Sequence, residues 1–176
     1  MNLTKIIIVG LLMIAVFAGG ALYYLQIYAY YDEVALAADD IQLTSIFTGE
    51  PEPILAENVE AIDGDSSPLK FRACFDTALS FGLLTETYTV YESAEPIVAP
   101  PWFACFDADQ IGEDLASGVA LAFLGTPNVQ YGIDRVVAVY PDGKAFAWHQ
   151  INHCGEVVFD GNPAPEDCPP APESLQ

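Results

Sequence analysis

The sequence predicts an α+β protein, with a single N-terminal transmembrane helix and one small periplasmic domain made of an antiparallel sheet and about two helices. Three observations lead to this fold class: a long uncharged apolar run near the N-terminus, a strand–turn–strand pattern around Asp142-Gly143, and four cysteines that all follow the apolar run. We therefore divide the chain into a transmembrane helix with an aromatic belt (residues 1–31), a periplasmic domain (32–161) and a proline-rich acidic C-terminal tail (162–176).

The apolar run covers residues 6–25 (IIIVGLLMIAVFAGGALYYL) and contains no charged side chain. At ~1.5 Å per residue a helix of this length spans about 30 Å, the thickness of the hydrocarbon core of a bilayer. Lys5 precedes the run and the first acid, Asp32, follows it, so the positive-inside rule places the N-terminus in the cytoplasm and exports the remainder. The alternative is a signal peptide cleaved before Gly19 or after Ala37, but the run exceeds the roughly 7–15 apolar residues typical of one.

Two features of this first segment suit contact with a second membrane helix. Small residues in the run form a small-xxx-small pattern, which permits two helix backbones to approach closely. Tyr24, Tyr28 and Tyr31 follow an i, i+4, i+7 spacing that predicts one helical face. An interfacial aromatic belt is the favoured interpretation of the tyrosines, and a helix-contact surface is the sharper one. The residues expected to contact another transmembrane subunit are Ala15, Ala18, Gly19, Tyr23, Tyr24, Tyr28 and Tyr31.

The chain from Asp32 onward is strongly acidic, because it holds all 25 acidic residues against four basic ones, a formal net charge of −21. Such a domain repels nucleic acid and anionic lipid and attracts cationic partners. A solvated surface is the favoured interpretation, and mutual repulsion that keeps the domain soluble is the second. The third is steering of a basic soluble protein such as a c-type cytochrome, which would weaken steeply as salt rises.

Between the apolar run and the first cysteine we expect little regular structure. The first helix is expected to continue through residues 32–40, and a short strand follows at 41–47. Three prolines, two glycines and many acids in residues 48–68 predict a loop with one brief strand.

A local repeat comes next, because RACFD at 72–76 resembles FACFD at 103–107. In each copy we expect the aspartate to cap a helix: Asp76 caps the helix directly after it, and Asp107 caps one that Gly118 ends. Two similar strand-to-helix junctions are therefore predicted.

An even number of cysteines in an exported domain predicts two disulfides, with three possible connectivities. The two similar junctions place Cys74 and Cys105 at comparable depth, so we prefer this pair, which would close a loop of roughly 30 residues. Cys168 is then expected to tie the tail to Cys154. The alternative is that Cys74 and Cys105 are two buried free thiols at similar packing positions.

The clearest β signal lies in the second half of the chain. Residues 119–125 read as one strand, and 135–150 read as a hairpin around its Asp-Gly turn. Residues 156–161 are predicted to add a further strand. The proline-rich segment 93–102 is expected to form an ordered loop with Trp102 against the core, and the tail is expected to be extended.

Two segments carry a resemblance to a known family: LTETYTVYESAEPIVAPPWFACFDADQIG at 84–112 and YGIDRVVAVYPDGKAFAWHQINHCGEVVFDGNP at 131–163. They resemble an uncharacterised family of single-span membrane proteins from alphaproteobacteria, some of which are mislabelled histidine kinases. The resemblance covers nearly the whole chain, including the tyrosine-rich segment. It implies a Gram-negative inner membrane and periplasmic exposure, and it implies no reaction. The kinase label has no support in this sequence, which lacks a nucleotide-binding glycine motif and a phospho-acceptor helix.

The two histidines, His149 and His153, lie beside Cys154 in an H-x₃-H-C pattern whose ligand types suit a soft or borderline metal. On a strand, however, positions four apart are separated by about 13 Å, too far for one ion without a bend. We therefore expect no metal and no cofactor, and keep this cluster as an alternative. The sequence also lacks a G-x-S-x-G elbow and a C-x-x-C pair, so we do not expect an enzyme.

These observations predict a membrane-anchored periplasmic accessory or assembly subunit of a larger inner-membrane complex, held to other transmembrane subunits by its helix. A respiratory or photosynthetic electron-transfer complex is the expected host, with the acidic face toward a basic c-type cytochrome and no nucleic acid partner. The alternative is a periplasmic binding or metal-handling protein that uses His149, His153 and Cys154.

Overall fold

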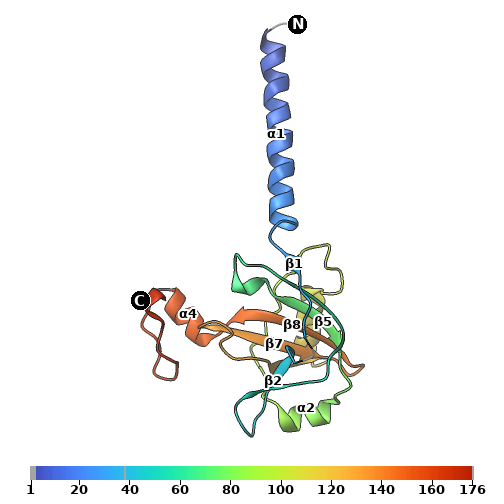
Figure 1. The fold of residues 1–176 in the computed structure, drawn as a ribbon, viewed down its shortest axis with the longest axis vertical. Coiled ribbons are helices and arrows are strands. Elements are labelled where there is room, and N and C mark those ends of the chain that lie inside the picture. The colour runs from blue at the N-terminus through green and yellow to red at the C-terminus, as the bar shows by residue number, and fades with distance from the viewer. Residues whose placement is uncertain (1–2, 38, 176) are drawn as a thin grey trace.

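A computed structural model describes residues 3–37 and 39–175, and Figure 1 shows a long helix, α1 (Leu3–Ile27), that stands away from a domain at its C-terminal end. An 18-residue stretch of α1 has a mean hydropathy of 2.5, and none of that stretch is buried in the protein. In the described part of the chain, α1 is the one helix with the length and composition to cross a membrane.

The domain combines short strands with three α-helices and two single-turn 3-10 helices in the described residues, so the predicted α+β class is confirmed. In chain order its elements are β1 (Asp32–Glu33), β2 (Gln42–Thr44), β3 (Pro51–Pro53), β4 (Glu57–Asp63), η1 (Pro68–Lys70), β5 (Arg72–Asp76), α2 (Phe81–Thr87), α3 (Ala108–Ser117), β6 (Leu121–Leu124), β7 (Ile133–Val139), β8 (Lys144–Ile151), α4 (His153–Phe159) and η2 (Glu173–Leu175).

The main sheet is antiparallel throughout, with the strand order β1-β4-β5-β8-β7-β6, and β2 and β3 form a separate hairpin. The predicted hairpin is confirmed: β7 pairs with β8 from Ile133↔Ile151 to Val139↔Ala145. Its turn requires Gly143, whose φ of +91° is the left-handed region that a Cβ disfavours. Strand β6 lies within the predicted 119–125 segment and pairs with β7.

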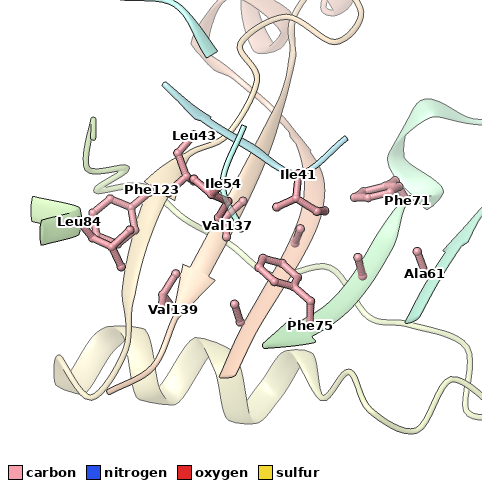
Figure 2. Close-up of a cluster of buried hydrophobic side chains, with 13 residues drawn as sticks. Ile41, Leu43, Ile54, Ala61, Phe71, Phe75, Leu84, Phe123, Val137 and Val139 are labelled. Carbon is pink, nitrogen blue, oxygen red and sulfur yellow. The ribbon is translucent and has the colours of Figure 1, made fainter. Parts of the chain in front are cut away.

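The sheet is buried on both faces, which explains why its central strands read as almost continuous apolar runs. On β8, Ala145 and Ala147 belong to one core cluster, while Phe146 and Trp148 belong to the other. The first cluster is closed by the β2–β3 hairpin, with Leu43 and its neighbours drawn in Figure 2. Helix α3 and the loop before it cover the second cluster.

Of the two predicted aspartate caps, one is confirmed. The Asp107 carboxylate accepts from the backbone N–H of Gln110, and Gly118 ends α3 with a φ of +75°. The prediction for Asp76 is wrong, because α2 begins at Phe81 after the cap Ser80. Asp76 is instead the last residue of β5, since its pairing with β8 continues to the start of the hairpin.

Three other secondary-structure predictions are wrong. The first helix ends at Ile27 and does not continue through 32–40, where β1 adds to the edge of the sheet. Residues 48–68, predicted as a loop with one brief strand, contain two strands: β3 and the seven-residue β4, whose polar residues gave little strand signal. Residues 156–159 belong to α4 and 160–161 to the turn after it, instead of a strand; Asn152 caps this helix by accepting from the Gly155 N–H.

Candidate functional site

The end of α1 is attached to the domain by a tryptophan. Trp102, in the loop before α3, donates its indole N–H to the backbone oxygen of Ile27 at 2.8 Å. Carbonyls in the last turn of a helix have no partner within the helix, so this bond satisfies a group that would otherwise need water. The Trp102 ring also meets Tyr31 edge-on at 6.4 Å. Trp102 is also packed against the second core cluster, so the expected docking against the core is confirmed. Its bond to Ile27 fixes the loop to the helix end.

A lysine makes a second attachment just beyond the helix. Lys70 donates from Nζ to the backbone oxygen of Tyr30 at 2.9 Å and to the hydroxyl of Ser66. The same ammonium group lies 4.7 Å from the ring centre of Tyr30 and 5.0 Å from that of Tyr31, within the range of cation–π attraction. Gly64 allows this approach, because a Cβ at that position would collide with the Tyr30 carbonyl.

A buried arginine links the two segments that make these attachments. Arg72 is 1% exposed and donates to the backbone oxygens of Ile97 (2.6 Å), Leu69 (2.7 Å) and Phe71 (2.6 Å). It also donates to Val98 at 3.3 Å, so one guanidinium joins the loop that carries Trp102 to the segment that carries Lys70. Burial lowers the pKa of Arg72 to about 10, which leaves it charged at neutral pH. We call Trp102, Lys70 and Arg72, with the residues they bond, the junction.

The predicted tyrosine face is divided by the end of the helix. Tyr23 and Tyr24 lie exposed on the last turns of α1, and Tyr28 packs on both, with ring centres 6.3 and 5.9 Å away. Tyr31 lies beyond the helix and packs on Trp102 in the domain, so the single face expected for Tyr24, Tyr28 and Tyr31 is not formed. The small residues Ala15, Ala18 and Gly19 are exposed on α1, and nothing lies within 4 Å of a Cβ built at Gly19.

Both preferred disulfides are formed. Cys74 and Cys105 join β5 to the residues just before α3, and Cys154 and Cys168 join α4 to the tail. The first bond crosses the second core cluster, and the second is the link between the tail and the domain that the sequence led us to expect.

The structure does not assemble the alternative metal set. The Cys154 sulfur is bonded to Cys168 in a disulfide, so it is not a thiolate ligand. His149 is buried on β8, where Nδ1 lies 2.7 Å from the backbone oxygen of Pro68 and Nε2 accepts from Arg135 Nε at 3.0 Å, so both ring nitrogens are occupied. His153 is exposed at the start of α4, and among the described residues its close ligand-type neighbours are Asp167 and Cys168, whose sulfur is also in the disulfide.

His149 is held by its surroundings as a neutral ring. Its ring stacks on Phe71 at a centroid distance of 4.6 Å, and Arg135 lies over the same phenyl ring at 4.1 Å. Burial, and then the positive charge of Arg135, lower the pKa of His149 to about 4. The only tautomer that fits both contacts carries its proton on Nδ1 and donates it to Pro68. This arrangement is a structural brace between β8 and η1.

Lys70, Arg72 and Gly64 are the site residues that the sequence analysis did not single out. A signal for two of them was present, because two of the only four basic residues after the apolar run stand at 70 and 72. In so acidic a chain, basic side chains are expected to have specific partners. The identity of those partners, mostly backbone oxygens, is set by tertiary structure and has no sequence signature.

The fold and the junction define a class: a single apolar helix that carries a disulfide-containing α+β domain fixed to its C-terminal end. The chain belongs to a family of unknown function, DUF6446, which matches residues 41–169. That range includes both disulfides and the junction residues Lys70, Arg72 and Trp102, and it leaves α1 outside the match. Comparisons with curated proteins and with solved structures gave no match.

Proposed function

We propose that this protein is a bitopic inner-membrane protein, with its N-terminus in the cytoplasm and its domain in the periplasm, that serves as an accessory or assembly subunit of a larger membrane complex. The observation that carries the proposal is the contrast between the body of α1 and its C-terminal end. The body has no buried residue, whereas Ile27 at the end is bonded by Trp102, and Tyr30 just beyond the helix is bonded by Lys70. The helix therefore has free faces for lipid and for other helices, and the domain moves with it.

The contacts of the segment after α1 support a retained helix over a cleaved signal peptide. Cleavage after Ala37 would remove β1, which pairs with β4, and would remove Val34, whose side chain packs on the first core cluster. Cleavage before Gly19 would keep these contacts but would leave a short apolar helix exposed to water. The two disulfides support an oxidising compartment, and Lys5 supports the cytoplasmic N-terminus.

The acidic charge of the domain suits one kind of host: an electron-transfer complex that a basic c-type cytochrome binds. Of the four basic residues after α1, Arg72 is buried and Lys70 is turned to Tyr30, which leaves a surface dominated by carboxylates. A purified basic c-type cytochrome should therefore bind the full chain at low salt and dissociate at physiological salt. Binding that is independent of salt would contradict this part of the proposal.

The experiment for the helix uses co-purification of the full-length protein from its native membranes in a mild detergent. Replacing Ala15, Ala18 and Gly19 together by leucine keeps the helix apolar but fills the surface on which a second helix would approach. The matched control replaces Met13, Phe17 and Gly20 by leucine on the opposite face of the same helix.

We expect the partner subunits to be lost from the first triple variant, by on the order of tenfold, and kept in the control. Equal recovery with both variants would show that the small-residue face has no role. A mature protein that starts at Gly19 or beyond, found by mass spectrometry of the intact chain, would overturn the proposal as a whole.

A further inference from the structure

The end of the domain remote from α1 carries an exposed phenylalanine on a tight turn. β2 and β3 are joined by residues 45–50, and this turn lies beside α2 at the opposite end of the molecule from the helix (Figure 1). Phe47 is 78% exposed, which is more than any large apolar side chain described on α1 itself. A phenylalanine on the domain is therefore more open to solvent than residues proposed to lie in lipid.

The turn is bonded to the end of α2, which places an apolar residue of that helix near Ile46 and Phe47 in the turn. Ile46 donates its N–H to the Thr87 oxygen at 2.9 Å, and Ser45 forms a β-bridge with Tyr88. Leu83 lies one helical turn before Thr87 and therefore on the same side of α2. Leu83 is 48% exposed and Ile46 is 51% exposed.

The adjacent leucines of α2 differ in exposure. Leu84, the residue after Leu83, is fully buried and points toward Phe123 in the core (Figure 2). Helix α2 thus already has its core contact and presents a second apolar side chain outward. We call Ile46, Phe47 and Leu83 the apolar tip.

The turn itself does not depend on Phe47. Its geometry rests on Gly49, with a φ of +73°, and on the bond from the Gly49 N–H to the Ser45 oxygen at 2.9 Å. Because the fold needs no phenyl ring at position 47, and a cluster of exposed apolar side chains is characteristic of a binding surface, the tip fits an interaction site.

The charge around the tip defines the kind of partner. Glu50, Glu52 and Glu86 stand in the same turn, strand and helix, and all five basic residues of the chain lie outside these segments. Glu52 accepts from the Thr48 hydroxyl at 3.1 Å, so it is held beside the tip. A second copy of the chain or an anionic lipid surface would bring negative charge against negative charge.

We propose that the apolar tip is a docking surface for a partner protein with an apolar depression ringed by lysine and arginine, in which Phe47 is the central anchor. The inference rests on the proposed anchorage, because α1 would hold the tip at the far side of the domain, facing away from the membrane. It gives the protein two contacts of different chemistry: a helix face inside the bilayer and a salt-sensitive tip outside it.

The test is site-specific photo-crosslinking with the full chain in its native membranes. A benzoyl-phenylalanine side chain is placed at Phe47, at Leu83 or, as a control, at Val119, which is 48% exposed after the end of α3. Crosslinked products are identified by mass spectrometry. The yield is compared at low and high salt, and in a Glu50→Lys/Glu86→Lys double variant.

We expect the same protein, with a basic contact region, to be joined at positions 47 and 83 and absent at 119. We expect its yield to fall on the order of tenfold at high salt or with the two charge reversals. The inference is overturned if positions 47 and 83 give no product, join only lipid or a second copy of this chain, or give the product seen at 119.

The outcome is separable from that of the proposed function. Filling the small-residue face of α1 leaves the tip intact, and a Phe47→Ser variant leaves α1 intact. The crosslinking yield at position 83 is therefore compared with and without the Phe47→Ser change. If the yield and the melting temperature are both unchanged, the docking role of Phe47 is refuted, even where the helix-face result stands.

Discussion

The contacts of the His149 side chain require a neutral ring, so they depend on pH. In the folded protein its pKa is lowered to about 4, whereas an unfolded histidine titrates near 6.5. The unfolded chain therefore takes up a proton first as the pH falls, and stability is lost between these two values. The contribution is fully present above pH 6.5 and declines below it.

We expect the free energy of unfolding to fall by about 2 kcal/mol between pH 7 and pH 5 because of His149. Thermal unfolding followed by circular dichroism measures this, over a range in which ordinary carboxylates remain ionised. A His149→Gln variant should lose most of this slope, and His153→Gln, which changes an exposed histidine, should retain it. A slope that survives in the first variant would show that another group is responsible.

Helices and strands were predicted correctly from the sequence where the contacts that fix them join residues close together in the chain. The Asp-Gly turn of β7–β8 and the Asp107 and Gly118 caps of α3 use residues within a few positions of one another, and all were predicted. β4 was underestimated because its strand character comes from pairing with β5. The segment of α4 has a strand-like composition, but the Asn152 cap makes it a helix.

The candidate site likewise combines features that the sequence predicted with features that depend on long-range contacts. Both disulfides were preferred from the sequence, but the two similar strand-to-helix junctions behind the Cys74–Cys105 choice are not formed, because α2 begins at Phe81 and residues 103–107 precede α3 as a loop. The shared face of Tyr24, Tyr28 and Tyr31 required the helix to continue, but the helix ends at Ile27, whose carbonyl is bonded by Trp102, 75 residues later. Contacts of such long range leave no periodic pattern in the sequence.

The two disulfides should contribute differently to stability. Cys74–Cys105 closes the longer loop, with a sequence separation of 31 against 14 for Cys154–Cys168, and Cys74 is buried in the second core cluster. Removing the first bond by Cys→Ser changes at both positions is expected to cost about 4 kcal/mol, and removing the second about 3 kcal/mol.

The losses should also differ in extent, which thermal unfolding and hydrogen exchange can separate. Loss of Cys74–Cys105 should lower the melting temperature of the whole domain, whereas loss of Cys154–Cys168 should increase exchange mainly in α4 and the tail. An equal, uniform effect of both changes would contradict this assignment.

For the whole molecule, the central prediction is that the domain rests at the membrane surface because its junction is bonded to the end of the span. The chain has two tryptophans that report on this separately. Trp102 bonds Ile27, two residues beyond the apolar run, so with α1 in a bilayer we expect it at the headgroup level that tryptophan favours. Trp148 is fully buried in the domain core.

Full-length protein reconstituted in vesicles should therefore lose fluorescence when its lipids are replaced by lipids brominated near the headgroup. The quenched part should belong to Trp102, so a Trp102→Phe variant should show no quenching while it keeps the emission of Trp148. Because the change also removes the bond to Ile27, worth about 1 kcal/mol, its fold is checked by circular dichroism. Quenching that persists in Trp102→Phe, or that is absent from the unaltered protein, would mean that the domain does not lie against the bilayer in the way the junction requires.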